Sequence, residues 1–405
     1  MQWPGRGRAA GMERLWAVLA CQAAFLLLCL VGPCQGDQYY DDYSGDSFEN
    51  DTGRPEVTIC IPRSIPGQEV IRGNKTFLSI SKSTRSHLNS SVIVTVVPTL
   101  YTLVFMVGLP SNGLGFWILA LKVKKMPSTI FLMNLAAADL LLIVMLPFKI
   151  SYYFLGNHWL FGEAMCRIVT LFFYGNMYCS VLLLMSISID RYIAVVHPFF
   201  SRSFRSRTFA TCMCVAIWLI SLAFTLPLTV FQQSYDLDQS DLTMCHDVLP
   251  RSDLSGYFFY HFVCLITLGF LVPLLIILFC YASVVKVLIS NGEKYSYAIK
   301  LTVLSLVITV ILFTPSNIVL LIHYSERCLS RFGDLYFIYM VCLALSTVNS
   351  CIDPFIYYYV SEEFRQKVRQ KILRSSKKTI TTTQTSKKNL PVCSSTTTTI
   401  THSLV

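Results

Sequence analysis

Residues 129–155, TIFLMNLAAADLLLIVMLPFKISYYFL, contain only two charged side chains, Asp139 and Lys149. Crossing the hydrocarbon core of a bilayer takes about 20 predominantly apolar residues in a helix, so this stretch is long enough to span a membrane. Six further stretches share its length and its low charge. They are residues 92–121, 164–196, 208–230, 254–285, 301–324 and 335–360.

The composition also indicates a membrane protein. Hydrophobic residues make up 54% of the 405 residues and charged residues 14%, whereas a typical soluble domain has about 25% charged residues. Backbone amides cannot stay unpaired in lipid, so each stretch must be a helix. The expected fold class is all-α, a bundle of seven transmembrane helices over residues 92–360. The internal repeats and lines of buried charge that favour a transporter or channel are not evident in the sequence.

The net charge of +10 is unevenly distributed, which indicates membrane topology rather than nucleic-acid binding. The loops on one side hold Lys122, Lys124, Lys125, Arg202, Arg205, Arg207, Lys286, Lys294 and Lys300. On the other side, residues 37–56 hold seven acids and one base, and the acidic loop, residues 231–253, holds five acids and one base. Because basic loops stay inside, we expect a multi-pass plasma-membrane protein with an extracellular amino end.

Both ends of the chain have their own composition. Residues 1–36 have the layout of a cleaved signal peptide, with basic residues before an apolar stretch, and an uncleaved extra helix is the alternative. Glycosylation sequons begin at Asn50, Asn74 and Asn89. After the last span, residues 361–372 are expected to lie on the lipid surface as a short amphipathic helix. Residues 373–405 form a Ser/Thr-rich tail that we expect to be disordered and cytoplasmic.

Two of the fifteen cysteines stand out by position, because most of the others lie inside apolar spans. Cys166 is at the outer end of the third span and Cys245 is in the acidic loop. A disulfide between them would hold that loop over the end of the bundle. A bridge between Cys60 and Cys328 is a further hypothesis, beside the alternative of free thiols.

Short motifs recur at set places along the spans. They are Asn112, Leu135-Ala136-Ala137-Ala138-Asp139, Asp190-Arg191-Tyr192, Trp218, Pro273, Tyr281, Phe313-Thr314-Pro315 and Asp353-Pro354-Phe355-Ile356-Tyr357. In this order and spacing they resemble the rhodopsin-like G-protein-coupled receptors, over about residues 92–372. The resemblance implies a switch for a heterotrimeric G protein, made by Asp190, Arg191, Tyr192, Tyr281 and Tyr357. By itself, Arg191 could equally be an anchor at the membrane surface.

Asp139 and Asp353 are carboxylates within apolar spans, which are costly to bury and therefore candidates for function. Together with Asn112, Ser180, Asn349 and Ser350, they could surround a sodium ion, as the resemblance implies for the inactive state. The alternative is a polar network filled with water. We expect no other cofactor and no other metal.

The segment before the first span contains Ile61-Pro62-Arg63 followed by Ser64-Ile65-Pro66-Gly67-Gln68. A Pro-Arg pair suits cleavage by a trypsin-like serine protease, and thrombin favours Pro before Arg. The acidic loop contains Cys245-His246-Asp247-Val248-Leu249-Pro250. With Tyr174, His323, Tyr324 and Tyr339, this loop resembles that of the protease-activated receptors.

This second resemblance implies a mechanism. Residues 37–63 would be an activation peptide, cleavage after Arg63 would create an ammonium on Ser64, and residues 64–68 would act as a tethered ligand. We expect Asp247 to attract the ammonium. The aromatic cleft that receives the ligand is expected to contain Tyr174, Phe262, Tyr324 and Tyr339, with His246 and His323 nearby. Residues 64–91 can span about 90 Å when extended, so we expect a flexible tether.

The resemblance also implies the partners inside the cell. These are G proteins of the Gq type and of a Rho-activating type, with calcium release and coagulation-type responses, and receptor kinases and arrestin acting on the tail. No pattern of nucleophile, base or metal ligands indicates an enzyme. The rival hypothesis is a receptor of the same class for a diffusible peptide, with Arg63 incidental.

Overall fold

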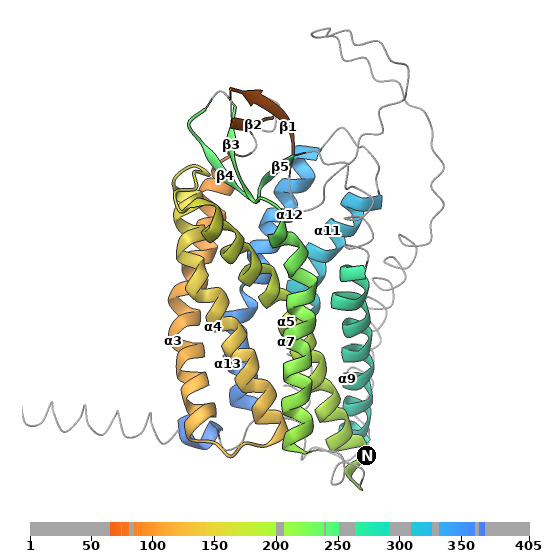
Figure 1. Ribbon diagram of the computed structural model, residues 1–405. Coiled ribbons are helices and arrows are strands. Elements are labelled where there is room, and N and C mark those ends of the chain that lie inside the picture. The colour runs from red at the N-terminus through yellow and green to blue at the C-terminus, as the bar shows by residue number, and fades with distance from the viewer. Residues whose placement is uncertain are drawn as a thin grey trace, which may run out of the picture.

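The computed structural model describes residues 65–368, with gaps at 74, 81–84, 87, 89, 200–205, 239, 251–263, 291–308, 326–331 and 361–363. Within this range the chain is a bundle of roughly parallel helices with a small sheet over one end (Figure 1). The proposed signal peptide, the asparagines of the three sequons, Cys60, Arg63, Ser64 and Cys328 all lie outside the described residues.

Seven spans form the bundle, and this confirms the expected fold class. Six helical segments are long and apolar enough to cross a membrane, and a seventh, shorter apolar helix lies at Val310–Val319. In chain order the elements are η1 (Val92–Val96) with α3 (Val97–Leu121), α4 (Pro127–Phe154), α5 (Gly162–Val196), α7 (Arg207–Val230), η2 (Thr267–Leu271) with α9 (Val272–Ser290), η4 (Thr309–Phe313) with α11 (Thr314–Ser325), and α12 (Phe332–Ser346) with α13 (Asn349–Val360). Residues 364–368, after the last span, are also helical.

The last span is interrupted between α12 and α13. There the amide of Thr347 donates to the carbonyl of Ala344, and the amide of Val348 donates to that of Leu345, so these bonds join residues three apart instead of four and the turn is tighter than in an α-helix. The next helix begins at Asn349, one turn before Asp353. Both of these polar residues, Asn349 and Asp353, are buried inside the bundle.

Packing inside the bundle is close, whereas its outer surface is apolar. A Cβ atom on Gly115 of α3 would lie 3.0 Å from the ring of Tyr357 on α13, so only glycine fits there without displacement. Leu103 and Met106 of the same helix are 55% and 66% exposed. A soluble protein rarely exposes such contiguous apolar surface, but lipid covers it in a membrane.

A five-stranded sheet covers one end of the bundle, which we call the mouth. Its strands are β1 (Ile65–Arg72), β2 (Lys75–Ser79), β3 (Ser234–Leu237), β4 (Thr243–Cys245) and β5 (Val248–Pro250), in the spatial order β4-β3-β2-β1-β5. The acidic loop supplies β3, β4 and β5. The segment before the first span supplies the central strands β1 and β2, so the expectation of a flexible tether does not hold for residues 65–79.

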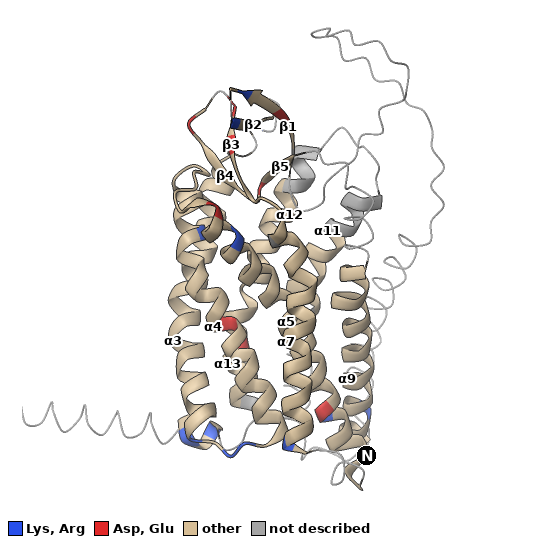
Figure 2. Ribbon diagram, in the orientation of Figure 1, with Lys and Arg blue, Asp and Glu red and all other residues tan. Residues whose placement is uncertain are grey.

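Charge differs between the two ends of the bundle. Basic residues gather along the loops at the end away from the sheet, whereas the sheet itself carries both acidic and basic residues (Figure 2). At the mouth, Glu163 fixes the start of the acidic loop by accepting hydrogen bonds from the amides of Gln233 (2.9 Å) and Ser234 (2.6 Å). Burial raises the pKa of the nearby Tyr235 phenol, and the negative charges of Glu69 and Glu163 add to this effect.

Candidate functional site

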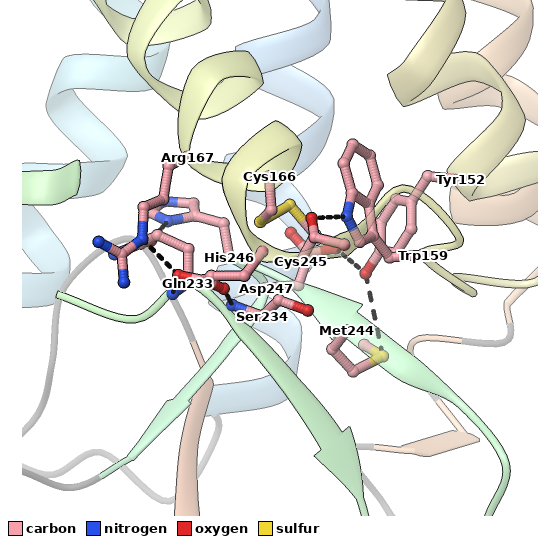
Figure 3. Close-up of a disulfide and its surroundings, with 12 residues drawn as sticks. Tyr152, Trp159, Cys166, Arg167, Gln233, Ser234, Met244, Cys245, His246 and Asp247 are labelled. Carbon is pink, nitrogen blue, oxygen red and sulfur yellow. Dashed lines mark hydrogen bonds and ion pairs between the residues drawn. A yellow bond between two sulfur atoms is a disulfide. The ribbon is translucent and has the colours of Figure 1, made fainter. Parts of the chain in front are cut away.

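The disulfide between Cys166 and Cys245 positions the acidic loop. It joins the start of α5 to the end of β4, with a Cα–Cα distance of 5.8 Å, and both residues are fully buried. The two residues after Cys245 lie next to the disulfide, between the helices and the strands (Figure 3). The disulfide expected from the sequence is therefore present, and it fixes where His246 and Asp247 lie.

His246 bends the loop into the bundle. Its φ angle is 68°, a left-handed conformation that a non-glycine residue adopts only where its surroundings enforce it. Nδ1 lies 2.6 Å from Oε1 of Gln233, and Nε2 lies 3.1 Å from the hydroxyl of Tyr174. Two polar contacts thus compensate the strained backbone and connect the loop to α5.

Asp247 is the acidic group at the mouth. Its side chain is 1% exposed, and its Oδ2 accepts a hydrogen bond of 2.8 Å from the hydroxyl of Tyr152 on α4. A cation, Lys149, lies one turn earlier on α4 and interacts electrostatically with Asp247. Its Nζ lies 5.9 Å from the ring centre of Tyr152 and 5.6 Å from that of Phe173. The carboxylate therefore accepts from a hydroxyl donor and also interacts with a cation that is held among aromatic rings.

The expected ligand segment already contacts this loop. The amide of Ile65 donates to the backbone carbonyl of Asp247 at 2.7 Å, and Ile65 is 8% exposed. From there β1 pairs in parallel with β5, with Ile65 opposite Val248 and Gly67 opposite Pro250. The backbone of the proposed ligand is thus placed beside the proposed acidic anchor.

The expected aromatic cleft is described only in part. Tyr174 is buried and its ring packs edge-on against His246, with centroids 5.2 Å apart, and Tyr339 of α12 is 4% exposed. Phe262 and the side chains of His323 and Tyr324 lie outside the described residues.

Lys149 and Tyr152 were not among the candidates from the sequence. The signal for Lys149 is nevertheless visible there, because an ionisable residue within an apolar span is a candidate for function. Tyr152 offers no such signal, since a tyrosine near the end of a span is usually an interfacial residue. Only its hydrogen bond to a loop 95 positions away assigns it to the site.

A second polar cluster lies in the middle of the bundle, around Asp139. Its Oδ1 accepts from the hydroxyl of Ser350 (2.8 Å) and its Oδ2 from that of Tyr357 (3.2 Å). The amide of Asn176 donates both to Asp139 and to Ser180, at 3.3 Å each. Asn176, absent from the sequence candidates, therefore links Ser180 to the cluster.

The other carboxylate, Asp353, accepts from the amide of Asn349 at 2.7 Å and is fully buried. Within the described residues, Oδ1 of Asp353 and Oδ1 of Asn349 have no hydrogen-bond donor. Buried acceptors without hydrogen-bond donors are costly, and one carboxylate oxygen beside one amide oxygen is the kind of ligand that a hard cation binds. These oxygens fit a sodium ion.

The inner end of the bundle contains the expected switch residues. Asp190 is 5% exposed, and the hydroxyl of Tyr192 lies 3.1 Å from Nε2 of His197. The ring of Tyr192 packs against Phe279 of α9, with centroids 5.7 Å apart. Tyr281 of α9 is also buried. Tyr357, by contrast, is bonded to Asn112 at 3.0 Å, and so belongs to the central cluster in this structure.

Comparison with known proteins agrees with this arrangement. Residues 111–357 match the family "7 transmembrane receptor (rhodopsin family)". The chain is 45% identical to Proteinase-activated receptor 4 of Homo sapiens, over 89% of this chain and 93% of that protein. It is also 45% identical to Proteinase-activated receptor 4 of Mus musculus, over 94% and 99%, and 39% identical to Proteinase-activated receptor 3 of Homo sapiens, over 80% and 84%.

Proposed function

Because the chain belongs to the rhodopsin family of seven-transmembrane receptors, and within it to the proteinase-activated receptors, we propose that cleavage after Arg63 activates it. The family consists of receptors, which confirms that the chain is not an enzyme. In sequence, residues 64–68 and 134–142 resemble those of the fourth member of the protease-activated receptors, and the 45% identity to Proteinase-activated receptor 4 confirms this likeness for the chain as a whole.

One observation supports the proposal most strongly, namely the hydrogen bond from the amide of Ile65 to the carbonyl of Asp247. Ser64 is bonded to that amide, and consecutive Cα atoms are about 3.8 Å apart. A cut after Arg63 therefore creates the new ammonium on the residue directly before Ile65, whose amide is bonded to the Asp247 carbonyl.

The electrostatics of the site support binding of that ammonium. Two opposite charges attract far more strongly in a buried site than in water, and the Asp247 carboxylate is buried. Before cleavage the nitrogen of Ser64 is an uncharged amide, so the attraction appears only after the cut. Thrombin, or another protease that recognises Pro62-Arg63, is the proposed activator at the extracellular side.

The contacts of the site connect the mouth of the bundle to the central polar cluster. Asp247 and His246 touch α4 and α5 through Tyr152 and Tyr174. These two helices also contribute Asp139 and Ser180 to the central cluster. In our proposal a sodium ion at Asp353 and Asn349 holds the inactive state. Its release frees the inner end for a Gq-type or Rho-activating G protein, with the tail serving receptor kinases and arrestin.

The decisive experiment compares wild-type receptor with Arg63→Ala in cells loaded with a calcium indicator. Thrombin and trypsin should raise calcium in cells with the wild-type receptor and not in cells with the variant. A synthetic Ser-Ile-Pro-Gly-Gln-Glu peptide should activate both equally, because it supplies the free amine directly. If thrombin still activates Arg63→Ala, the receptor responds to another site or to a diffusible ligand.

A further inference from the structure

We propose that the hairpin of β1 and β2, which we call the arm hairpin, holds the tethered ligand at the start of β1 on the acidic loop before cleavage, with residues 70–79 as its fixed anchor. The inference rests on the proposed function, since it concerns how the cut segment reaches its site. It assigns the positioning role to residues 70–79, downstream of the ligand itself.

The order of the strands is the first argument. The arm hairpin occupies the centre of the sheet, with β2 paired to β3 and β1 paired to β5. Without it, the loop would retain only the β3–β4 hairpin and the three residues of β5. A two-stranded hairpin is marginal in water, so the arm completes the sheet rather than resting on it.

Contacts of Arg72 at the end of β1 and of Leu78 in β2 hold the hairpin independently of the ligand. The amide of Asp238 donates to the carbonyl of Leu78 at 2.8 Å, and Leu78 is fully buried. Nη2 of Arg72 lies 3.2 Å from the Asp238 carboxylate, whose side chain is only 7% exposed. None of these three residues belongs to the ligand segment, so these contacts do not depend on the new amino end that cleavage creates.

The hairpin fixes the ligand strand through close packing at Gly67. A Cβ atom there would lie 3.0 Å from both Cβ of Leu78 and Cγ1 of Val248. The ligand backbone is therefore enclosed between the anchor strand and the acidic loop, at a spacing where any larger residue would have to displace its neighbours.

This arrangement changes the energetics of activation. A flexible tether gives an effective concentration of about millimolar, and ordering the ligand then costs conformational entropy. An anchor that exists before the cut already holds the ligand segment on the acidic loop, so this entropy cost does not arise at activation. Cleavage then changes the charge at residue 64 rather than the location of the ligand.

The experiment separates protease activation from peptide activation in the full-length receptor. Arg72→Asp and Asp238→Arg each place like charges at the anchor, and the double variant R72D/D238R restores an opposite pair. Phe77→Pro removes a donor from the central strand β2, with Phe77→Val as its matched control. Release of an amino-terminal epitope measures cleavage, and calcium responses are recorded with thrombin and with Ser-Ile-Pro-Gly-Gln-Glu.

We expect thrombin to lose potency by about 3- to 10-fold in the charge-reversal variants and more in Phe77→Pro. Epitope release should be unchanged, and the double variant and Phe77→Val should resemble wild type. Peptide potency should stay equal or improve, because the free peptide lacks residues 70–79 and no longer competes with a held arm. Equal thrombin potency in all variants, or a parallel loss of peptide potency, would overturn the proposal. Thrombin activation of Arg63→Ala would instead contradict the proposed function.

Discussion

The hydroxyl of Tyr152 donates a 2.8 Å hydrogen bond to the carboxylate of Asp247, and so connects α4 to the loop that carries the proposed ligand site. Hydrogen bonds to charged groups contribute about 1.5–3 kcal/mol. We therefore expect Tyr152→Phe to lower the potency of Ser-Ile-Pro-Gly-Gln-Glu by about tenfold. Calcium responses at matched surface expression measure this, with Phe154→Leu, an exposed position on the same helix, as control.

Asp247→Asn should remove the attraction for the new ammonium while preserving the shape of the side chain. The free peptide should lose about tenfold or more in potency. An analogue without the amino group should act equally on variant and wild type, because it never makes the charged contact. Unchanged potency of the amino peptide would show that Asp247 does not bind the ammonium.

Lys149 is the resident cation near Asp247, so it competes with the ammonium for the same negative charge. Lys149→Met should raise the potency ratio of the amino peptide to its analogue without the amino group by about 3- to 10-fold, which is about 1 kcal/mol. Lys149→Arg keeps the charge and should keep the wild-type ratio. A ratio that falls in Lys149→Met would mean that the lysine supports, rather than opposes, ammonium binding.

The disulfide closes a loop of 79 residues between Cys166 and Cys245. Loop-closure entropy for that length corresponds to about 4.5 kcal/mol. The double variant C166S/C245S should lower the melting temperature of purified receptor and reduce peptide potency, since His246 and Asp247 are no longer fixed. Cys212→Ser, at an exposed free cysteine, should change neither measurement.

The buried oxygens of Asp353 and Asn349 that have no donor predict sodium-dependent stability. Sodium at about ten times its dissociation constant should stabilise the receptor by about 1.4 kcal/mol. The melting temperature of wild-type receptor should be higher in sodium chloride than in choline chloride, and Asp353→Asn should abolish the difference. Identical wild-type melting temperatures in the two salts would argue for a water-filled network instead.

The sequence by itself determined the membrane bundle, because a hydrocarbon core admits only helices of a given length and leaves little freedom of fold. It also determined the pairing of Cys166 with Cys245, through their positions, and the pair of buried carboxylates. Tertiary structure decided what these residues contact. Asn176, Lys149 and Tyr152 enter their sites through helix packing, which composition does not specify. The arm hairpin depends on pairing with strands more than 150 residues away, and no local pattern determines such a register.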